Sequence, residues 1–149
     1  MTTCIVDTSI LLELLNVPGF VAQHHALLAE FAERQKREHF LLPLVVLIET
    51  GNHIAHVPDG AARRKAAEVF VAFAVEALDG ELPFVPTPSP ARDQMLTWLK
   101  DFPDRAMAGV GLADRSLIAL WEEQRELQPK RRVYIWSLDQ HLLGYDSAG

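Results

Sequence analysis

Four acidic residues interrupt apolar stretches of the chain, and their carboxylates are of the type that binds divalent cations. Asp7 and Asp139 each close a short apolar run. Glu49 lies inside an apolar stretch, and Asp114 stands just before one. An ionised carboxylate rarely lies against a hydrophobic core unless it is paired or binds a metal. No matching set of Lys or Arg accompanies the four acids in these stretches, so they suggest a divalent-cation site.

The donor set favours hard cations and hydrolysis of a phosphate ester. Mg²⁺ and Mn²⁺ prefer carboxylate oxygens and water as ligands. Without a cation the carboxylates would repel one another, and at least one would tend to hold a proton. A cation bound there would lower the pKa of a coordinated water and stabilise negative charge on a phosphodiester. The hydroxyls of Thr8, Ser9 and Ser137 could orient a carboxylate or that water.

An alternation of strands and helices must position these acids. The predicted strands are 3–7, 40–42, a short edge strand around 84–85 and 132–138. The predicted helices are 9–15, 20–38, 44–56, one from an Asp59 cap to 78, one from 90 to 102 capped by Ser89, 112–127 and 139–145. The alternation predicts an α/β fold, a doubly wound parallel sheet of about four or five strands with helices on both faces.

Ligands of such sheets bind at the carboxyl ends of the strands. Asp7 and Asp139 stand at the carboxyl ends of two predicted strands. Glu49 lies about two turns into the helix after the second strand, and Asp114 lies near the start of the helix before the last one. We therefore expect all four carboxylates to face one rim of the sheet. Each has a simpler interpretation by itself: an Asp often caps a helix, and Glu49 suits the exposed face of an amphipathic helix.

Length and composition limit the alternatives. The 149 residues fit a single domain spanning 1–149, and the apolar content argues against disorder. The longest apolar run, 40–48, is broken by Pro43 and too short to span a bilayer, and no signal peptide opens the chain, so no membrane is expected. Cys4 is the single cysteine, which excludes an internal disulfide; we expect it to be buried, and a reducing cytoplasm fits best.

The charge balance argues against nonspecific coating of nucleic acid, because the net charge is −6. Local basic clusters can still hold phosphates. Arg63, Arg64 and Lys65 form the first such cluster and are the candidate RNA-binding residues, and residues 130–132 form a second. Runs of like charge also commonly mark a solvated surface, and that interpretation stays open for both clusters.

Four short motifs resemble those of PIN-domain ribonucleases, especially the toxins of VapBC-type bacterial toxin–antitoxin pairs. The motifs are Ile5–Leu11, Ile48–Asn52, Leu112–Ala119 and Ser137–Asp139, and they occur in the family's order over nearly the whole chain. The resemblance implies a PIN-like domain, with Ser137 standing where the family often has Thr.

The resemblance also implies function. It implies an endoribonuclease that depends on Mg²⁺ or Mn²⁺, a homodimer, and a small antitoxin partner whose tail covers the site. The resemblance assigns catalytic and metal-binding roles to Asp7, Glu49, Asp114 and Asp139, and a supporting hydroxyl role to Thr8 or Ser9 and to Ser137.

Two other functions fit parts of the sequence. A non-catalytic interaction module on the same fold is indicated by the strongly apolar helix around 70–78, which could pack against a dimer mate or an antitoxin. A phosphoryl-transfer or receiver-like domain is indicated by Asp7 at a strand end. Ser9 counts against that reading, because haloacid-dehalogenase-like phosphatases need a second Asp at that position, and the acidic pair expected beside the first strand of receivers is also absent.

Overall fold

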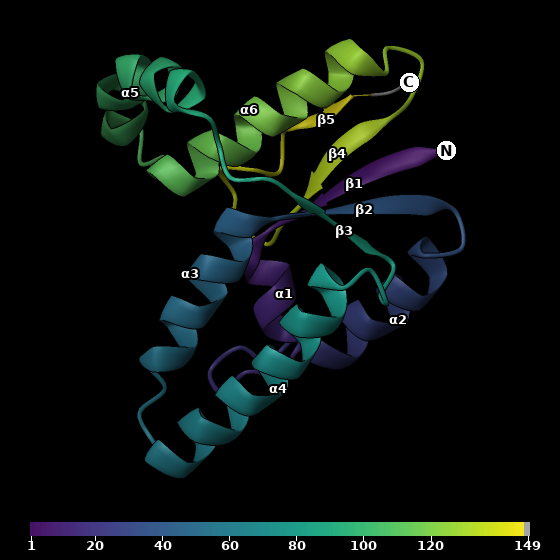
Figure 1. The fold of residues 1–149 in the computed structure, drawn as a ribbon, viewed down its shortest axis with the longest axis vertical. Coiled ribbons are helices and arrows are strands. Elements are labelled where there is room, and N and C mark those ends of the chain that lie inside the picture. The colour runs from purple at the N-terminus through teal and green to yellow at the C-terminus, as the bar shows by residue number, and fades with distance from the viewer. Residues whose placement is uncertain (148–149) are drawn as a thin grey trace.

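The computed structural model describes residues 1–147, which form an α/β fold of five strands and six helices. The strands are β1 (Thr2–Val6), β2 (Glu38–Pro43), β3 (Phe84–Thr87), β4 (Val133–Trp136) and β5 (Asp146–Ser147). The helices are α1 (Thr8–Leu14), α2 (His24–Arg34), α3 (Leu44–Ala55), α4 (Gly60–Leu78), α5 (Arg92–Met107) and α6 (Leu112–Leu127). The predicted fold class is confirmed, and the arrangement is consistent with a PIN-like fold (Figure 1).

The sheet has the strand order β3-β2-β1-β4-β5. Strands β1 to β4 run parallel, and β5 pairs antiparallel with β4. The chain adds β2 and β3 on one side of β1 and then crosses to the other side for β4. This reversal of strand order opens a crevice beyond the carboxyl ends of β1 and β4, where ligands of doubly wound sheets bind.

Helices cover both faces of the sheet (Figure 1). Helices α1 to α4 lie on one face, and α6 lies on the other, where it packs on β4. Helix α5 packs on α6, and none of its residues is fully buried. Both α3 and α6 begin near the carboxyl edge of the sheet, so their first turns approach the crevice from opposite faces.

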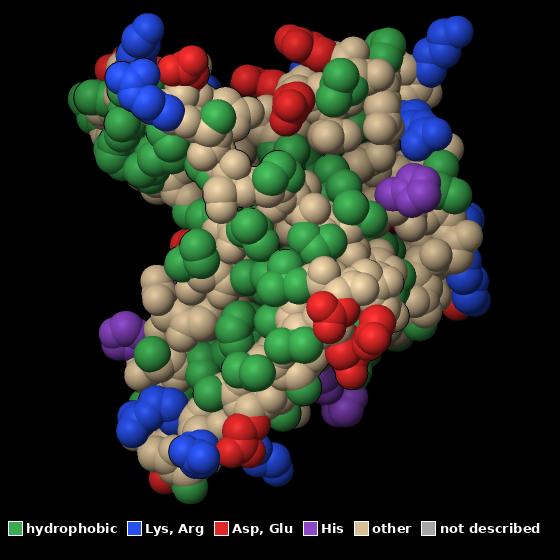
Figure 2. Space-filling model, viewed as in Figure 1, with side chains coloured by type: hydrophobic (Ala, Val, Ile, Leu, Met, Phe, Trp, Pro, Cys, Tyr) green, Lys and Arg blue, Asp and Glu red, His purple; other side chains and the backbone are tan. Residues whose placement is uncertain are grey.

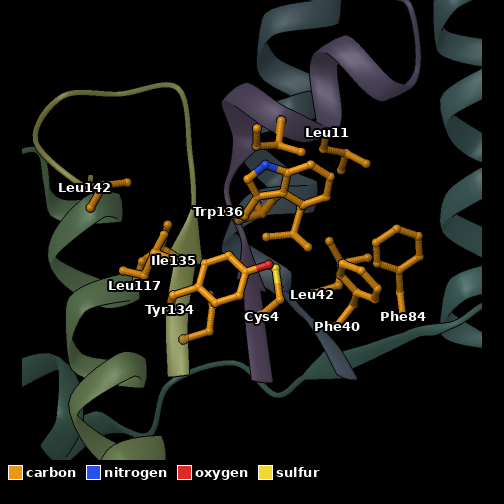
Figure 3. Packing of buried hydrophobic residues seen from close by; sticks show 14 of the residues in the cluster. Cys4, Leu11, Phe40, Leu42, Phe84, Leu117, Tyr134, Ile135, Trp136 and Leu142 are labelled. Carbon is orange, nitrogen blue, oxygen red and sulfur yellow. The ribbon is translucent and has the colours of Figure 1, made fainter. Parts of the chain in front are cut away.

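The core forms because β1 and β4 are covered on both faces, which requires nearly continuous apolar sequence. Phe40 is fully buried and contacts the rings of Phe84 and Trp136 (Figure 3). Cys4 lies in this core with no exposed surface, as predicted, and burial raises the pKa of its thiol to about 12. A thiol that stays protonated is a poor nucleophile, so Cys4 is a structural residue.

Several predicted element boundaries are wrong. Helix α5 continues through Pro103 to Met107 and begins at Arg92, with the side chain of Gln94 rather than Ser89 bonded at its start. Proline removes one helical hydrogen bond, and α5 tolerates this because Pro103 is exposed and water can satisfy the freed carbonyl. Helix α2 is shorter than predicted, spanning His24–Arg34.

The predicted terminal helix over 139–145 does not form. Turns replace it, and they lead into the short strand β5, which was not predicted. The edge strand predicted around 84–85 is confirmed as β3, where Pro86 is acceptable because the strand is at the edge of the sheet. Among residues 1–147, no helix is long and apolar enough to cross a membrane.

Candidate functional site

Asp7 is the most buried of the four acids and lies at the crevice between β1 and β4. It follows β1 directly, is 4% exposed, and caps the N-terminus of α1. Its Oδ2 accepts hydrogen bonds from the hydroxyls of Ser9 at 2.8 Å and Ser137 at 2.7 Å. Because Val6 and Trp136 are paired in register, the residues after them, Asp7 and Ser137, come together automatically. The sheet register therefore creates the centre of the site.

The same two hydroxyls organise the segment that carries Asp139. The hydroxyl of Ser9 accepts from the backbone N–H of Leu138 at 2.9 Å, and the hydroxyl of Ser137 accepts from that of Asp139 at 2.9 Å. Each hydroxyl donates its one proton to Asp7 and accepts from the turn after β4. The hydroxyls thus connect the carboxylate of Asp7 to the position of Asp139.

Glu49 faces the same crevice from α3. Its Oε1 accepts a hydrogen bond from the Thr8 hydroxyl at 3.1 Å, which gives Thr8 a place in the site. Burial and the negative charge of Asp7 together raise the pKa of the Glu49 carboxyl, although the hydrogen bond from Thr8 and the nearby His53 act in the opposite direction. Glu49 and Asp7 are thus near enough for the charge of one to disfavour ionisation of the other.

Asp114 has the most perturbed carboxyl of the four. It lies in the first turn of α6 and is half-buried. Burial, which is the largest cause, and the negative charges of the other three acids together raise its pKa to about 6; these acids are Asp7, Asp139 and Glu49. A pKa near neutrality at an acidic cluster indicates negative charge that the protein itself does not neutralise.

The structure therefore brings the four predicted acids into one electrostatic cluster. Within residues 1–147, however, no three His, Cys, Asp or Glu side chains converge closely enough to enclose a metal ion as they stand. Local hydrogen bonds explain part of this separation: the Glu49 carboxylate is bonded to Thr8, and that of Asp139 accepts from the His141 N–H at 2.9 Å. The side chains of these acids would have to rotate before three of their carboxylates could contact one cation.

The chemistry of the cluster nevertheless fits a hard divalent cation. All four donors are carboxylates, which suit Mg²⁺ or Mn²⁺. A cation near Asp114 would favour its ionised form and so oppose the burial and the neighbouring negative charges that raise its pKa to about 6. The residues that would hold the cation are Asp7, Glu49, Asp114 and Asp139.

Two features of the site were not anticipated from sequence. His141 is close enough to Asp114 for its positive charge to lower the pKa of that carboxyl. Gly109 makes room for this histidine: its φ is +85°, and a Cβ there would lie 3.3 Å from Nε2 of His141. His141 stands two residues after Asp139, a position that could have suggested its role.

Arg115 is the second unanticipated feature. Its side chain is buried beside Asp114, and its Nε donates to Asp101 of α5 at 2.8 Å. This hydrogen bond lowers the pKa of the Asp101 carboxyl. Within residues 1–147, Nη1 of Arg115 is buried without a hydrogen-bond partner. Arg115 thus anchors α5 on α6 immediately next to the site.

The basic residues lie away from the acids. Arg63, Arg64 and Lys65 occupy the start of α4, at the far end of the α3–α4 pair from the sheet (Figure 1). Arg63 donates to the Val57 carbonyl at 3.0 Å, and Arg64 pairs with Glu68 at 3.1 Å. These contacts fit a solvated helix end as well as a phosphate contact. The cluster at 130–132 precedes β4 and so lies at the opposite edge of the sheet from the acids.

Removing the Ser137 hydroxyl is expected to weaken metal binding. Ser137→Ala leaves Asp7 with one hydroxyl donor and leaves the Asp139 N–H without its acceptor. Loss of a group that orients a metal ligand typically costs 10–100-fold in affinity, so we expect Mn²⁺ affinity to fall by about 10–100-fold. Isothermal titration with Mn²⁺ measures this. Thr97→Ala, which removes an exposed hydroxyl bonded to the Asp93 carbonyl, serves as the control; equal Mn²⁺ affinity in Ser137→Ala and wild-type protein would contradict the prediction.

Comparisons of the chain with protein-family models, with curated proteins and with solved structures found no match. The functional interpretation consequently depends on the geometry and charge of the site.

Proposed function

We propose that the protein is a metal-dependent endoribonuclease of the PIN-domain type that hydrolyses RNA phosphodiester bonds with Mg²⁺ or Mn²⁺. The observation that carries the proposal is the placement of Asp7, held by the Ser9 and Ser137 hydroxyls, at the carboxyl edge of the sheet with the other three acids near enough to act on Asp114. Clustered acids at the carboxyl edge of a doubly wound sheet suit a cation that binds a phosphate. The four motifs that resemble PIN-domain ribonucleases contain these same acids.

In this proposal the acids and the hydroxyls of the site have different roles. Asp7 is the fixed point, because two hydroxyls and the start of α1 hold its carboxylate. Glu49 and Asp114 approach from opposite faces of the sheet, so they would hold the cation between them and Asp7. A bound cation supplies an activated water and neutralises charge on the phosphate. Ser9 and Ser137 keep Asp7 oriented.

We further propose that the protein acts in the cytoplasm as the toxin of a toxin–antitoxin pair, as a homodimer that binds a small antitoxin. Exposed apolar side chains support the existence of protein partners. Val71, Val75 and Leu78 lie on α4 and are each more than half exposed. They recur at helical spacing, so they form one apolar stripe. Figure 2 shows hydrophobic side chains gathered across the middle of this face of the molecule.

Purified protein incubated with a mixed pool of tRNA and mRNA tests the activity. We expect cleavage with Mn²⁺ or Mg²⁺ and none in excess chelator, because the proposed mechanism relies on the cation to lower the pKa of the attacking water and to stabilise charge on the phosphate. Gel analysis of the RNA measures the result, and the metal should restore activity when it is added back. Strong cleavage that persists in excess chelator would rule out the metal mechanism.

A non-catalytic interaction module remains the second candidate. The observation in its favour is that the four carboxylates do not enclose a metal ion within residues 1–147. It predicts no RNA cleavage and no detectable binding of millimolar Mn²⁺ by folded protein. Titration with Mn²⁺ therefore separates the two candidates.

A further inference from the structure

An apolar groove lies beside the acidic cluster. It has a volume of about 640 Å³ and is bounded by the start of α3, the end of β3 with residues 88–90 that follow it, and the facing sides of α5 and α6. Figure 2 shows the hollow at the left edge of the molecule, below the projecting α5. We call it the α5 groove. Its size falls within the range of small-molecule sites.

The α5 groove is lined by residues that adjoin two of the acids in the chain. Ile48 and Ala113 line it, and they directly precede Glu49 and Asp114 in the chain. The same two helices therefore carry the groove wall and two of the acids. A nucleotide whose phosphate lay at the acids would have its neighbouring bases within reach of the groove.

The lining of the α5 groove suits a nucleobase. Trp98 lines the groove with a partly buried indole, and apolar neighbours such as Met95 and Leu120 line it as well. Gln94 and Gln124 bring amide groups that can donate and accept hydrogen bonds. Aromatic stacking combined with a few polar groups is how proteins hold unstacked bases of single-stranded RNA.

Charge selects which part of an RNA could enter. Glu123 is the charged residue among those lining the groove, and its charge is negative. A phosphate would be repelled there, whereas a neutral, planar base would not. Pro88 and Pro90 restrict the backbone of one wall of the groove, which lowers the entropy cost of ordering that wall around a ligand.

We propose that the α5 groove binds a base of the single-stranded RNA substrate, stacked on Trp98, and so positions the adjoining phosphate at the acids. This proposal rests on the proposed ribonuclease function. It makes Trp98 a substrate-binding residue, and it makes the Arg115–Asp101 pair a positioning contact, because that pair holds the α5 wall against α6.

Binding of a short, fluorescently labelled RNA tests the proposal separately from cleavage. Fluorescence anisotropy is measured with Mg²⁺ in an Asp7→Asn background, which prevents loss of the probe. We expect Trp98→Ala to weaken binding of single-stranded RNA about tenfold, Trp98→Phe to restore most of it, and the same sequence as a duplex to bind about tenfold more weakly. Leu96→Ala removes an exposed apolar side chain of α5 that does not line the groove, and is expected to leave binding unchanged.

The outcomes separate the two proposals. Metal-dependent cleavage with RNA binding unaffected by Trp98→Ala would overturn the groove proposal and leave the nuclease intact. Trp98-dependent binding without cleavage by wild-type protein would overturn the nuclease and support the groove as an RNA site. A change from dimer to monomer in Trp98→Ala, measured by light scattering, would assign the groove to a second copy of the chain and overturn the proposal. Thermal melts confirm that each variant is folded.

Discussion

Replacing Asp7 with asparagine is expected to reduce metal-dependent RNA cleavage by roughly 100-fold or more. Loss of residues that merely orient ligands costs 10–100-fold, and Asp7 is itself a proposed ligand. The substitution removes the negative charge at the centre of the cluster while it changes the shape of the side chain very little. The defect should therefore appear as weakened Mn²⁺ binding and lost cleavage together.

The Asp7→Asn variant should remain folded, because asparagine can preserve most of what holds Asp7 in place. Its amide oxygen can accept the hydrogen bonds that Ser9 and Ser137 donate to the carboxylate. Asparagine is also as good as aspartate at the N-cap position that Asp7 occupies at the start of α1. An activity loss in this variant thus reports the missing charge rather than unfolding.

Cleavage rates of wild-type and Asp7→Asn protein at saturating Mn²⁺ measure the effect. Asp59→Asn is the matched control, because Asp59 caps α4 through the Ala62 N–H at 2.8 Å but lies exposed at the far end of the α3–α4 pair. The control makes the same chemical change at another N-cap, and we expect wild-type activity from it. Retention of more than about half the wild-type rate by Asp7→Asn would remove Asp7 from the mechanism, given the 10–100-fold scale expected.

The positions of Asp7 and Ser137 could be predicted because strand pairing determines them. Apolar runs that precede them mark two buried strands, and parallel strands bring their carboxyl ends to one edge. Predicting the positions of Glu49 and Asp114 required one more inference. The helix after β2 and the helix before β4 must both start at that edge. Local sequence patterns carry this information, so the rim of the sheet could be predicted from the sequence.

The remaining features depend on tertiary contacts that no local pattern reports. Residues 139–145 have a helical composition, but pairing of β5 with β4 and the turn bonded to Ser9 and Ser137 prevent a helix. Pro103 signals the end of a helix, yet α5 is exposed enough to continue past it. Arg115 looks like a surface residue until α5 places Asp101 beside it. The α5 groove was unpredicted for the same reason, since its walls come from four separate segments.

Asp114→Asn is expected to stabilise the metal-free protein at alkaline pH while abolishing activity. The pKa of Asp114 is about 6 in the folded chain against a model-peptide value of 3.8. Between these two values the folded state binds more protons than the unfolded state, so stability falls as pH rises through the interval. Above pH 6 the ionised carboxylate remains a penalty that a neutral asparagine does not have.

The size of the effect follows from the shift in the pKa of Asp114. Each pKa unit corresponds to 1.36 kcal/mol, but Asp114 is half-buried and solvent screens part of the repulsion. We therefore expect Asp114→Asn to increase the free energy of unfolding by about 1–2 kcal/mol at pH 8 and by close to nothing at pH 4. For a chain of this length the melting temperature should rise by roughly 2–4 °C per kcal/mol.

Thermal melts at pH 4 and pH 8, in chelator and in Mn²⁺, measure these differences. Glu81→Gln removes one negative charge from an exposed loop and controls for the change in net charge. A cation that neutralises the cluster should stabilise the wild-type protein most, since ligand binding to the folded state adds to its stability. At pH 8 we therefore expect Asp114→Asn to be the more stable protein in chelator. In Mn²⁺ we expect the wild type to be the more stable protein, because it gains more from the metal. If Asp114→Asn melted at the same temperature as wild type at pH 8 in chelator, neither burial nor the neighbouring carboxylates would destabilise ionised Asp114, and the electrostatic support for a cation site would be lost.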